Sequence, residues 1–505
     1  MEMRPSPISR RQFIKHTAKS TAVGALAGMS GPVWSQPIGA NDDIRIAIVG
    51  LNAHGTGDHL NKYLQMPGVR VVALCDPDTN VLARSVKRVG KATPNIRTFT
   101  DIRKLLAEKD VDAVSGATPN HWHALSTVWA CQAGKHVCVE KPVSHNIWEG
   151  RKMIEAAAKY DRMVQADLDK RSSVALGRAA DYIQSGELGK ILIVHSWVYK
   201  RRGSMGKAGS AGGRIPTSID YDLWCGPAPK GPLPRRKLHY DWHWQWDTGN
   251  GEIGNNGPHH LDACRWAMGE KGLPKSVISF GGRYGYDDDG QTPNTHITLF
   301  EYDSAPILFE VRGLPRKSGS GLMDPYNAVS RKGMKLFRGH NSGSPNNGEI
   351  VVCENGYVDL GKLTVFDRQG KAVKTFSGRG SNAKQNFIKA LRSGKQSDLK
   401  TTMLNGHLST SLCHMGNISY RVGKASGIEQ VKDVIEKDQQ VLDAVERTRQ
   451  HLSANGVDLK TAGLTLGPKL SMDSTKEQFT GQFANQANAL VKRKYRKPFV
   501  IPDKV

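Results

Sequence analysis

The feature that most constrains the fold is a glycine loop that directly follows a short β-branched run. Residues 44–49 read Ile-Arg-Ile-Ala-Ile-Val, a pattern typical of a buried parallel strand. The next residues match a dinucleotide-binding fingerprint in which Asn52 replaces the middle glycine. Gly50 can make the tight turn, and Gly55 lets the next helix pack closely with its amides toward a pyrophosphate. We expect Asn52 to tolerate a positive φ, so the loop survives the replacement.

An acidic residue follows the second predicted strand. Residues 69–74 are again β-branched, and the run ends at Cys75-Asp76, 26 residues after Gly50. This is near the position at which an acid accepts hydrogen bonds from an adenosine ribose. A solvated turn or a helix-capping aspartate is the alternative. The acid disfavours a 2′-phosphate, so we predict NAD as the cofactor, with NADP left open.

Strands and helices continue to alternate after Asp76. We predict a helix over 102–107, a strand over 111–114, a helix ending at Ala133 and a strand over 134–139. This order favours a doubly wound parallel sheet, in which ligands bind at the carboxyl ends of the strands. The residues that we assign to the cofactor lie at those ends: Gly50, Asn52, Ala53, His54, Gly55, Asp76, Thr118, Pro119, Asn120, His123, Glu140 and Lys141.

Three motifs in this order resemble a known family. They are the glycine loop, Thr118-Pro119-Asn120-His121-Trp122-His123-Ala124, and the run from Gly134 to Glu140-Lys141-Pro142. They are similar to those of the glucose-fructose oxidoreductase/inositol dehydrogenase (Gfo/Idh/MocA) family, and the resemblance extends from about Ile44 to about Gly423. It implies a Rossmann domain followed by an α+β domain with an open, mainly antiparallel sheet. It also implies that Lys141 approaches the nicotinamide and the reacting hydroxyl. A surface lysine before a turn proline is the alternative.

The second half mixes strands with helices, as the resemblance implies. Strands are predicted over 191–199, 277–284, 297–302 and 305–313, and we expect helices on one face of their sheet. The predicted organisation is a signal peptide (1–35), a linker (36–43), a Rossmann domain (44–170), a substrate domain (171–425) and an extension (426–505). The extension contains an amphipathic helix over 431–452, and we expect it to pack on the second domain.

Two stretches of the second half carry candidate substrate residues. Residues 239–246 hold three tryptophans, a tyrosine and two histidines, which suit the flat faces and polar edges of sugar rings. An aromatic core is the alternative. Residues 254–262 enter a helix, and the resemblance implies that His259 accepts the hydroxyl proton. The family often has an aspartate where this chain has Asn255, which can orient a substrate but cannot share the proton. We place Arg171, His243, Trp244, Asn255, His259 and His260 at the substrate, with Lys141, Asn255 and His259 as the catalytic set.

A metal is not expected, because the histidine spacing matches no metal motif. The seven cysteines form no CxxC pair, so we expect small buried hydrophobes rather than a disulfide framework.

The N-terminus resembles a twin-arginine export signal. Arg10 and Arg11 precede an apolar stretch over 21–29 that is too short to cross a membrane. We therefore expect export of the folded protein to the periplasm and no membrane-spanning segment. The net charge of +24 is scattered, with its densest run over 492–497. We expect no nucleic-acid partner, and a homo-oligomer formed through the second-domain sheet.

These observations leave three functions open. The first is hydride transfer between NAD(P) and a hydroxyl carbon of a sugar, glycoside or cyclitol, with Lys141 and His259 handling the proton. The second is a redox-neutral glycosidase that keeps a tightly bound NAD and passes through oxidation, elimination and re-reduction. The third is a noncatalytic protein that binds a sugar or dinucleotide.

Overall fold

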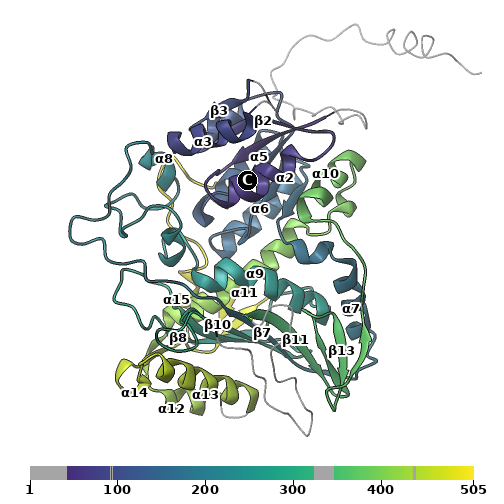
Figure 1. The fold of residues 1–505 in the computed structure, drawn as a ribbon, viewed down its shortest axis with the longest axis vertical. Helices are drawn as coiled ribbons and strands as arrows, with labels where there is room; N and C mark the ends of the chain where they lie inside the picture. Colours follow the sequence, from purple (N-terminus) through teal and green to yellow (C-terminus); the bar gives the residue numbers. More distant parts are fainter. Residues whose placement is uncertain (1–42, 91–92, 94, 324–345, 436–438) are drawn as a thin grey trace, which may run out of the picture. The chain divides into compact units, whose positions relative to one another are not determined.

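The computed structural model describes residues 43–505 except 91–92, 94, 324–345 and 436–438. The predicted signal peptide over 1–35 lies outside these residues, and so does the linker apart from Asp43. The described chain consists of a parallel sheet flanked by helices and a larger second sheet (Figure 1). None of the described helices is both long and apolar enough to cross a membrane.

The first domain contains a six-stranded parallel sheet in the order β3-β2-β1-β4-β5-β6. Its strands are β1 (Ile44–Val49), β2 (Val69–Cys75), β3 (Arg97–Phe99), β4 (Ala113–Gly116), β5 (His136–Val139) and β6 (Val164–Ala166). The chain starts in the middle, runs to one edge and then returns to build the other half. The structure therefore confirms the predicted doubly wound Rossmann sheet.

Alternating side chains of β1 explain why both faces of this sheet are covered. Ile44, Ile46 and Ile48 pack on one face, whereas Ala47 and Val49 pack on the other. The flanking elements are the π-helical turn η1 (Gly55–Leu60), α2 (Asn61–Leu64), α3 (Thr79–Val89), α4 (Ile102–Leu106), α5 (Asn120–Gln132) and α6 (Ile147–Lys159). Buried strands with helices on both sides favour apolar residues on both faces, and in β1 only the half-buried Arg45 departs from this pattern.

The second sheet has twelve strands and is mainly antiparallel, as predicted; the exception is the parallel pair β7–β10. Its central strands are β11 (Asn347–Cys353), β7 (Ile191–Tyr199), β10 (Pro306–Arg312), β9 (Thr295–Glu301) and β8 (Ser276–Gly282). One edge adds β12 (Gly356–Asp359), β13 (Thr364–Asp367) and β14 (Ala372–Thr375). The other adds β16 (Leu464–Leu466), β15 (Lys424–Ser426), β17 (Leu470–Asp473) and β18 (Gln478–Thr480).

Helices cover both faces of the second sheet, so the prediction of helices on one face was wrong. The face toward the Rossmann domain packs on α7 (Val174–Gln184), α9 (Gly251–Met268) and α11 (Met403–Val422). The opposite face packs on α12 (Ile428–Val434), α13 (Gln439–Ala454) and α14 (Leu459–Ala462), drawn below the sheet in Figure 1. These helices replace the single predicted helix over 431–452.

This second cover bears on the predicted homo-oligomer. Ile193, Trp197, Ile297 and Leu308 point to the outer face and are buried beneath the chain's own α12 and α13. A partner sheet therefore has no direct access to these side chains, and an oligomer would have to use other parts of the surface. The prediction of an oligomer itself stays a prediction.

The extension also reaches back to the first domain. β16 and β17 pair with β8 of the second sheet, so this part of the extension packs on the second domain. Farther along, Phe499, Ile501 and Val505 lie in the core of the Rossmann domain. Phe499 contacts Trp122 edge to face, with ring centroids 5.6 Å apart. Residues from both ends of the described chain thus build one core.

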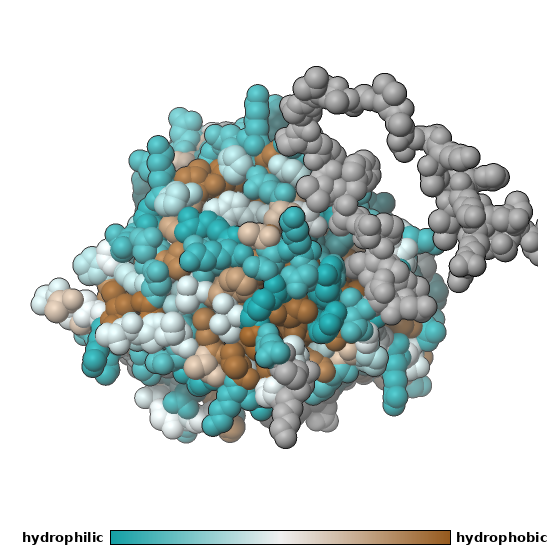
Figure 2. Space-filling view, turned by 90° about the horizontal axis from the view of Figure 1, so that it is seen from above, coloured by the Kyte–Doolittle hydropathy of each residue, from teal (hydrophilic) through white to brown (hydrophobic). Residues whose placement is uncertain are grey.

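The seven cysteines are all buried and unpaired, in agreement with their interpretation as small hydrophobes. The surface seen from above in Figure 2 mixes hydrophilic side chains with small, separate hydrophobic areas.

Candidate active site

The glycine loop adopts the turn that its residues suggest. Gly50 has φ of 80° and donates its N–H to the carbonyl of Cys75 at 2.9 Å. A Cβ on Gly50 would lie 2.6 Å from the backbone nitrogen of Thr118, and one on Gly55 would overlap the carbonyl oxygen of Gly50. Both glycines are therefore required sterically. The positive φ falls on Ala53, at 48°, and not on Asn52, so the expected reason for the asparagine was wrong.

Asp76 holds the loop from the next strand. One carboxylate oxygen accepts the N–H of Leu51 at 2.8 Å, and the other accepts the N–H of Asp78 at 2.9 Å. Burial raises the pKa of Asp76 to about 6. Each carboxylate oxygen has a second lone pair, and the side chain lines a cavity, so it can still accept a ribose hydroxyl.

A cavity of ≈ 320 Å³ lies at the carboxyl ends of the parallel strands. Every residue that we assigned to the cofactor lines it except Gly55, which is buried beneath the loop. The hydroxyl of Thr118 is buried there without a hydrogen-bond partner in the described part of the chain. A mostly apolar cavity beside a glycine turn, with an unpaired buried hydroxyl and an acid at the ribose position, fits a dinucleotide.

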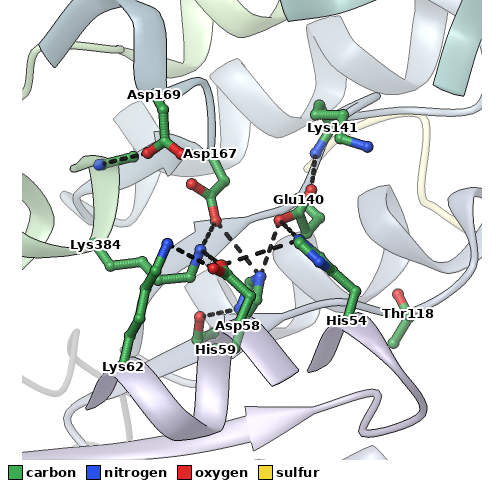
Figure 3. A network of polar contacts seen from close by, with 12 residues as sticks. His54, Asp58, His59, Lys62, Thr118, Glu140, Lys141, Asp167, Asp169 and Lys384 are labelled. Atoms are coloured by element: carbon green, nitrogen blue, oxygen red, sulfur yellow. Dashed lines mark hydrogen bonds and ion pairs between the residues drawn. The ribbon is translucent and has the colours of Figure 1, made fainter. Parts of the chain in front are cut away.

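Glu140 joins the glycine-loop segment to the lysine motif (Figure 3). Its Oε1 lies 2.8 Å from Nε2 of His54 and 3.0 Å from Nε2 of His59, and its Oε2 accepts the N–H of Lys141 at 3.1 Å. Hydrogen bonds from the two imidazoles hold the pKa of Glu140 well below its usual range despite its burial. His59 is fully buried and was missed in the sequence, where it reads as one polar residue of an amphipathic helix.

The same corner contains a set of side chains that could ligate a metal. Ligand atoms of His54, Asp58, His59 and Glu140 all lie within 4.8 Å of one another. Asp58 is already paired with Lys62 and Lys384 at 2.5 Å each, and Lys384 also bonds Asp167 (Figure 3). These ammonium groups already neutralise the carboxylates, so a divalent cation would add uncompensated charge. We assign no metal to this cluster.

The candidate catalytic residues meet where the Rossmann domain faces α9. The Lys141 ammonium donates to the backbone carbonyl of Asn255 at 3.0 Å, across the two domains. Burial and the nearby Lys141 charge lower the pKa of His259 well below its ordinary value. The imidazole is therefore neutral at pH 7. It makes no hydrogen bond with any residue that the structure describes, and it approaches the cavity from behind the lining residues Lys141 and Asn255 without lining it.

Asn255 is oriented by a charged pair behind it. Its amide lies 3.4 Å from Glu252, whose carboxylate forms a two-pronged ion pair with Arg202 at 2.8 Å for each contact. Neither Arg202 nor Glu252 was predicted at the site. Each is an ordinary charged residue in the sequence, and only the fold brings them together.

Among the predicted substrate residues, His243 and Asn255 line the cavity. His243 stacks on Trp242 with ring centroids 3.6 Å apart, and burial lowers its pKa to about 3. Arg171, Trp244, His259 and His260 are not among the residues that line the cavity. Arg171 pairs with Asp262 at 2.8 Å, His260 bonds Glu349 at 2.5 Å, and Trp244 is buried with Arg202 5.6 Å from its ring centroid.

Other aromatic residues of the same stretch line the cavity instead. Tyr240 and Trp242 line the cavity, and Tyr240 has an unusual φ of 66° and bonds Arg202 at 2.5 Å. His239 reaches the first domain, where its Nε2 lies 3.2 Å from Asp78. The composition of the stretch marked it as a site. The backbone path through the 3₁₀ turn Asp241–Trp244 determines which of these rings face the cavity.

Each of the two domains matches a known family model. Residues 44–168 match the family model described as oxidoreductase family, NAD-binding Rossmann fold. Residues 183–310 match the oxidoreductase family, C-terminal alpha/beta domain. Together the two matches span about half of the chain.

Individual relatives share part of the chain. A glycosyl hydrolase family 109 protein 2 from Shewanella sp. is 30% identical over 210 residues, 37% of this chain and 45% of that protein. An inositol 2-dehydrogenase from Salmonella typhimurium is 33% identical over 158 residues, 31% of this chain and 46% of that protein. The chain thus spans less than half the length of these curated relatives.

A solved structure shares the fold over a longer range. The WlbA dehydrogenase from Bordetella pertussis, in complex with NADH and UDP-GlcNAcA, superposes with a TM-score of 0.53 at 18% identity. The match covers 75% of this chain and 97% of that one. With an NAD-binding Rossmann domain, a mainly antiparallel second domain and family matches to both, the chain belongs to the Gfo/Idh/MocA oxidoreductase family.

Proposed function

We propose that the protein oxidises a hydroxyl-bearing carbon of a sugar, glycoside or cyclitol with NAD, and that Lys141 and His259 handle the proton. The observation that carries this proposal is the Lys141 ammonium, which lines the cofactor cavity and bonds α9 at Asn255. The same helix carries His259, whose pKa is lowered by burial and by the charge of Lys141. The inositol 2-dehydrogenase relative supports the substrate class.

The proposed chemistry divides between the cofactor and the chain. NAD, when bound, supplies the hydride acceptor. The hydroxyl must lose its proton as its C–H bond breaks, and the neutral imidazole of His259 accepts it. The Lys141 ammonium stabilises the alkoxide that develops. The side-chain amide of Asn255 does not ionise near neutral pH, so Asn255 orients the hydroxyl but takes no part in the proton transfer.

Replacing Lys141 with Ala tests this assignment. Turnover over a panel of sugars, methyl glycosides and cyclitols, followed by nicotinamide absorbance, should fall by about a thousandfold or more. Binding of NAD, measured by calorimetry, should change little because the cavity keeps its other lining residues. Lys109→Ala, an exposed lysine outside the cavity, is the control and should keep full activity. Unchanged turnover in Lys141→Ala would refute the role.

A second function uses the same residues for a redox-neutral cleavage. The glycosyl hydrolase family 109 relative favours it. Oxidation of one ring carbon acidifies the neighbouring C–H, so a glycosidic bond can leave by elimination, and return of the hydride restores the cofactor. Release of nitrophenol from nitrophenyl glycosides without accumulation of NADH would establish this reaction. Accumulation of NADH in proportion to product would establish net oxidation instead.

We further propose that NAD is loaded before export to the periplasm and stays bound. The twin-arginine motif supports export of a folded protein, and free NAD is scarce outside the cytoplasm. Nucleotide released by denaturing protein purified from the periplasm should be close to one per chain. Replacing Arg10 and Arg11 with Lys should keep the protein in the cytoplasm, as fractionation and blotting would show. Apoprotein in the periplasm would contradict retention, and periplasmic protein despite the replacements would contradict the route.

A further inference from the structure

A second cavity, of ≈ 900 Å³, lies apart from the cofactor cavity. We call it the basic cavity. Its walls come from one side of α11, from the segment after the lysine motif, from residues 246–250 and from residues 488–500. The two cavities share no lining residue, and they adjoin where Asn250 of the basic cavity bonds Asn120 of the cofactor cavity at 2.9 Å. A ligand here would therefore be a different molecule from the cofactor.

The lining is strongly cationic. It contains Arg421, Lys492, Arg493, Lys494 and Lys497, against a single lining acid, Asp247, and of these cations Lys492 is also paired with Asp503 at 2.5 Å. Burial lowers the pKa of the lining histidines His145 and His414, so they are neutral and add no charge. A concave surface of one sign concentrates ions of the opposite sign. The cavity therefore selects for an anionic ligand.

The basic run over 492–497 is a built wall rather than a solvated tail. Tyr495 donates its hydroxyl to Glu149 at 3.0 Å, and Arg496 bonds Asp222 and the carbonyl of Gly226. With these two side chains anchored, Lys494 and Lys497 line the cavity with no ion pair or hydrogen bond to any described residue. Two exposed cations on an anchored backbone segment thus line the cavity without a partner among the described residues.

Polar groups in the walls are also left unpaired. Nε2 of His145, Nδ2 of Asn146 and Oδ1 of Asn417 are buried and have no hydrogen-bond partner among the residues described. Asn146 and Asn417 are 5% and 4% exposed. Buried polar atoms are almost always satisfied, so unpaired donors and an acceptor around one cavity indicate groups that a ligand or ordered water completes.

We propose that the basic cavity binds an acidic saccharide, a short oligosaccharide whose sugar units carry carboxylates. Lysine and arginine side chains would pair with the carboxylates, and asparagine amides would bond the hydroxyls. Arg421 is held 5.0 Å from the ring centroid of Trp246, which fixes one cation next to an aromatic wall suited to a sugar ring. The volume suits a ligand of a few rings. The proposal does not depend on the reaction at Lys141.

Trigalacturonate is the probe, and its methyl ester is the neutral control with the same rings. Calorimetry on the NAD-loaded protein at low salt should show binding of the acid and not of the ester. The double variant Lys494→Ala/Lys497→Ala should weaken that binding by about tenfold or more. The matched double variant Lys87→Ala/Lys389→Ala removes the same charge at exposed positions outside the cavity and should bind like the unmodified protein.

Three results would overturn the proposal. Equal loss of affinity in the two double variants would mean that only net charge attracts the saccharide. Equal binding of the ester would mean that charge plays no part. Competition by a short single-stranded DNA at equal strength, lost in the same variant, would assign the cavity to a phosphate backbone. Turnover at the cofactor site is measured separately and should persist in both variants.

Discussion

Two hydrogen bonds fix Lys141, one from its backbone and one from its side chain. Its backbone N–H donates to Glu140, and its ammonium donates to the carbonyl of Asn255 in the other domain. Glu140 is in turn held by His54 and His59. A long, flexible side chain normally loses much rotamer freedom when it is ordered. Here the loss has occurred before any ligand binds, because the fold supplies both hydrogen bonds.

His259 and His260 are adjacent, but only His260 forms a hydrogen bond with a described residue, Glu349. Variants of the two histidines therefore form a matched pair. His259→Gln should lower turnover by about a hundredfold or more, since glutamine accepts no proton, while NAD affinity stays the same. His260→Gln should mainly lower stability, by about 1–3 kcal/mol, because Glu349 and Lys170 lose a buried partner.

The two effects are separated by measuring turnover and urea unfolding for both variants. If His259→Gln kept normal turnover while His260→Gln lost it, the assignment of the base would be reversed.

For single residues, the sequence predicted the location of those that directly follow a strand. Asp76 and Lys141 each follow a strand, so their place at the sheet edge depends on local order alone. Arg171 and His260 could not be judged in this way. Their partners, Asp262 and Glu349, come from other elements, and Glu349 is nearly 90 residues from His260 in the chain.

Among the elements, the glycine loop gives a sharp steric prediction. Gly55→Ala should abolish or strongly weaken NAD binding, because its Cβ would overlap the carbonyl of Gly50 and displace the loop. Gly57→Ala is the control from the same π-helical turn, where a Cβ would have no heavy atom within 4 Å. Calorimetric titration with NAD should show normal affinity for the Gly57 variant. Normal affinity in the Gly55 variant would show that the loop does not bind the dinucleotide.

Predictability also differed between elements. The strand predicted over 191–199 coincides with β7, because its apolar run is long and has clear ends. The extension was harder to interpret. Its strands β16, β17 and β18 are three or four residues long and carry no alternation strong enough to read. They exist because β8 offers an unpaired edge, which is information about tertiary structure.

The whole molecule should lose stability in mild acid. Burial lowers the pKa of His121, His296 and His414 to about 3 for each. Between their unfolded value near 6.5 and that range the unfolded chain binds more protons, so stability falls as the pH falls. Burial raises the pKa of Asp76 to about 6 and raises that of Asp167, which opposes the trend below pH 6.

The lowered histidines outnumber the raised aspartates, since His145, His259, His260 and His407 are shifted in the same direction. Each net proton is worth about 1.4 kcal/mol per pH unit. Urea unfolding midpoints should therefore decrease from pH 7 to pH 5. Equal midpoints at the two pH values would show that these imidazoles take up protons in the folded state.

The return of residues 499–505 to the Rossmann core has a consequence for how the chain folds. Ile44 and Ile501 belong to the same parallel-sheet domain although more than 450 positions separate them, and Lys159 donates to the carbonyl of Val505 at 2.5 Å. Contacts of such long sequence separation form late and slowly. During synthesis, the core of the nucleotide-binding domain can therefore be completed only after residues 499–505 have left the ribosome.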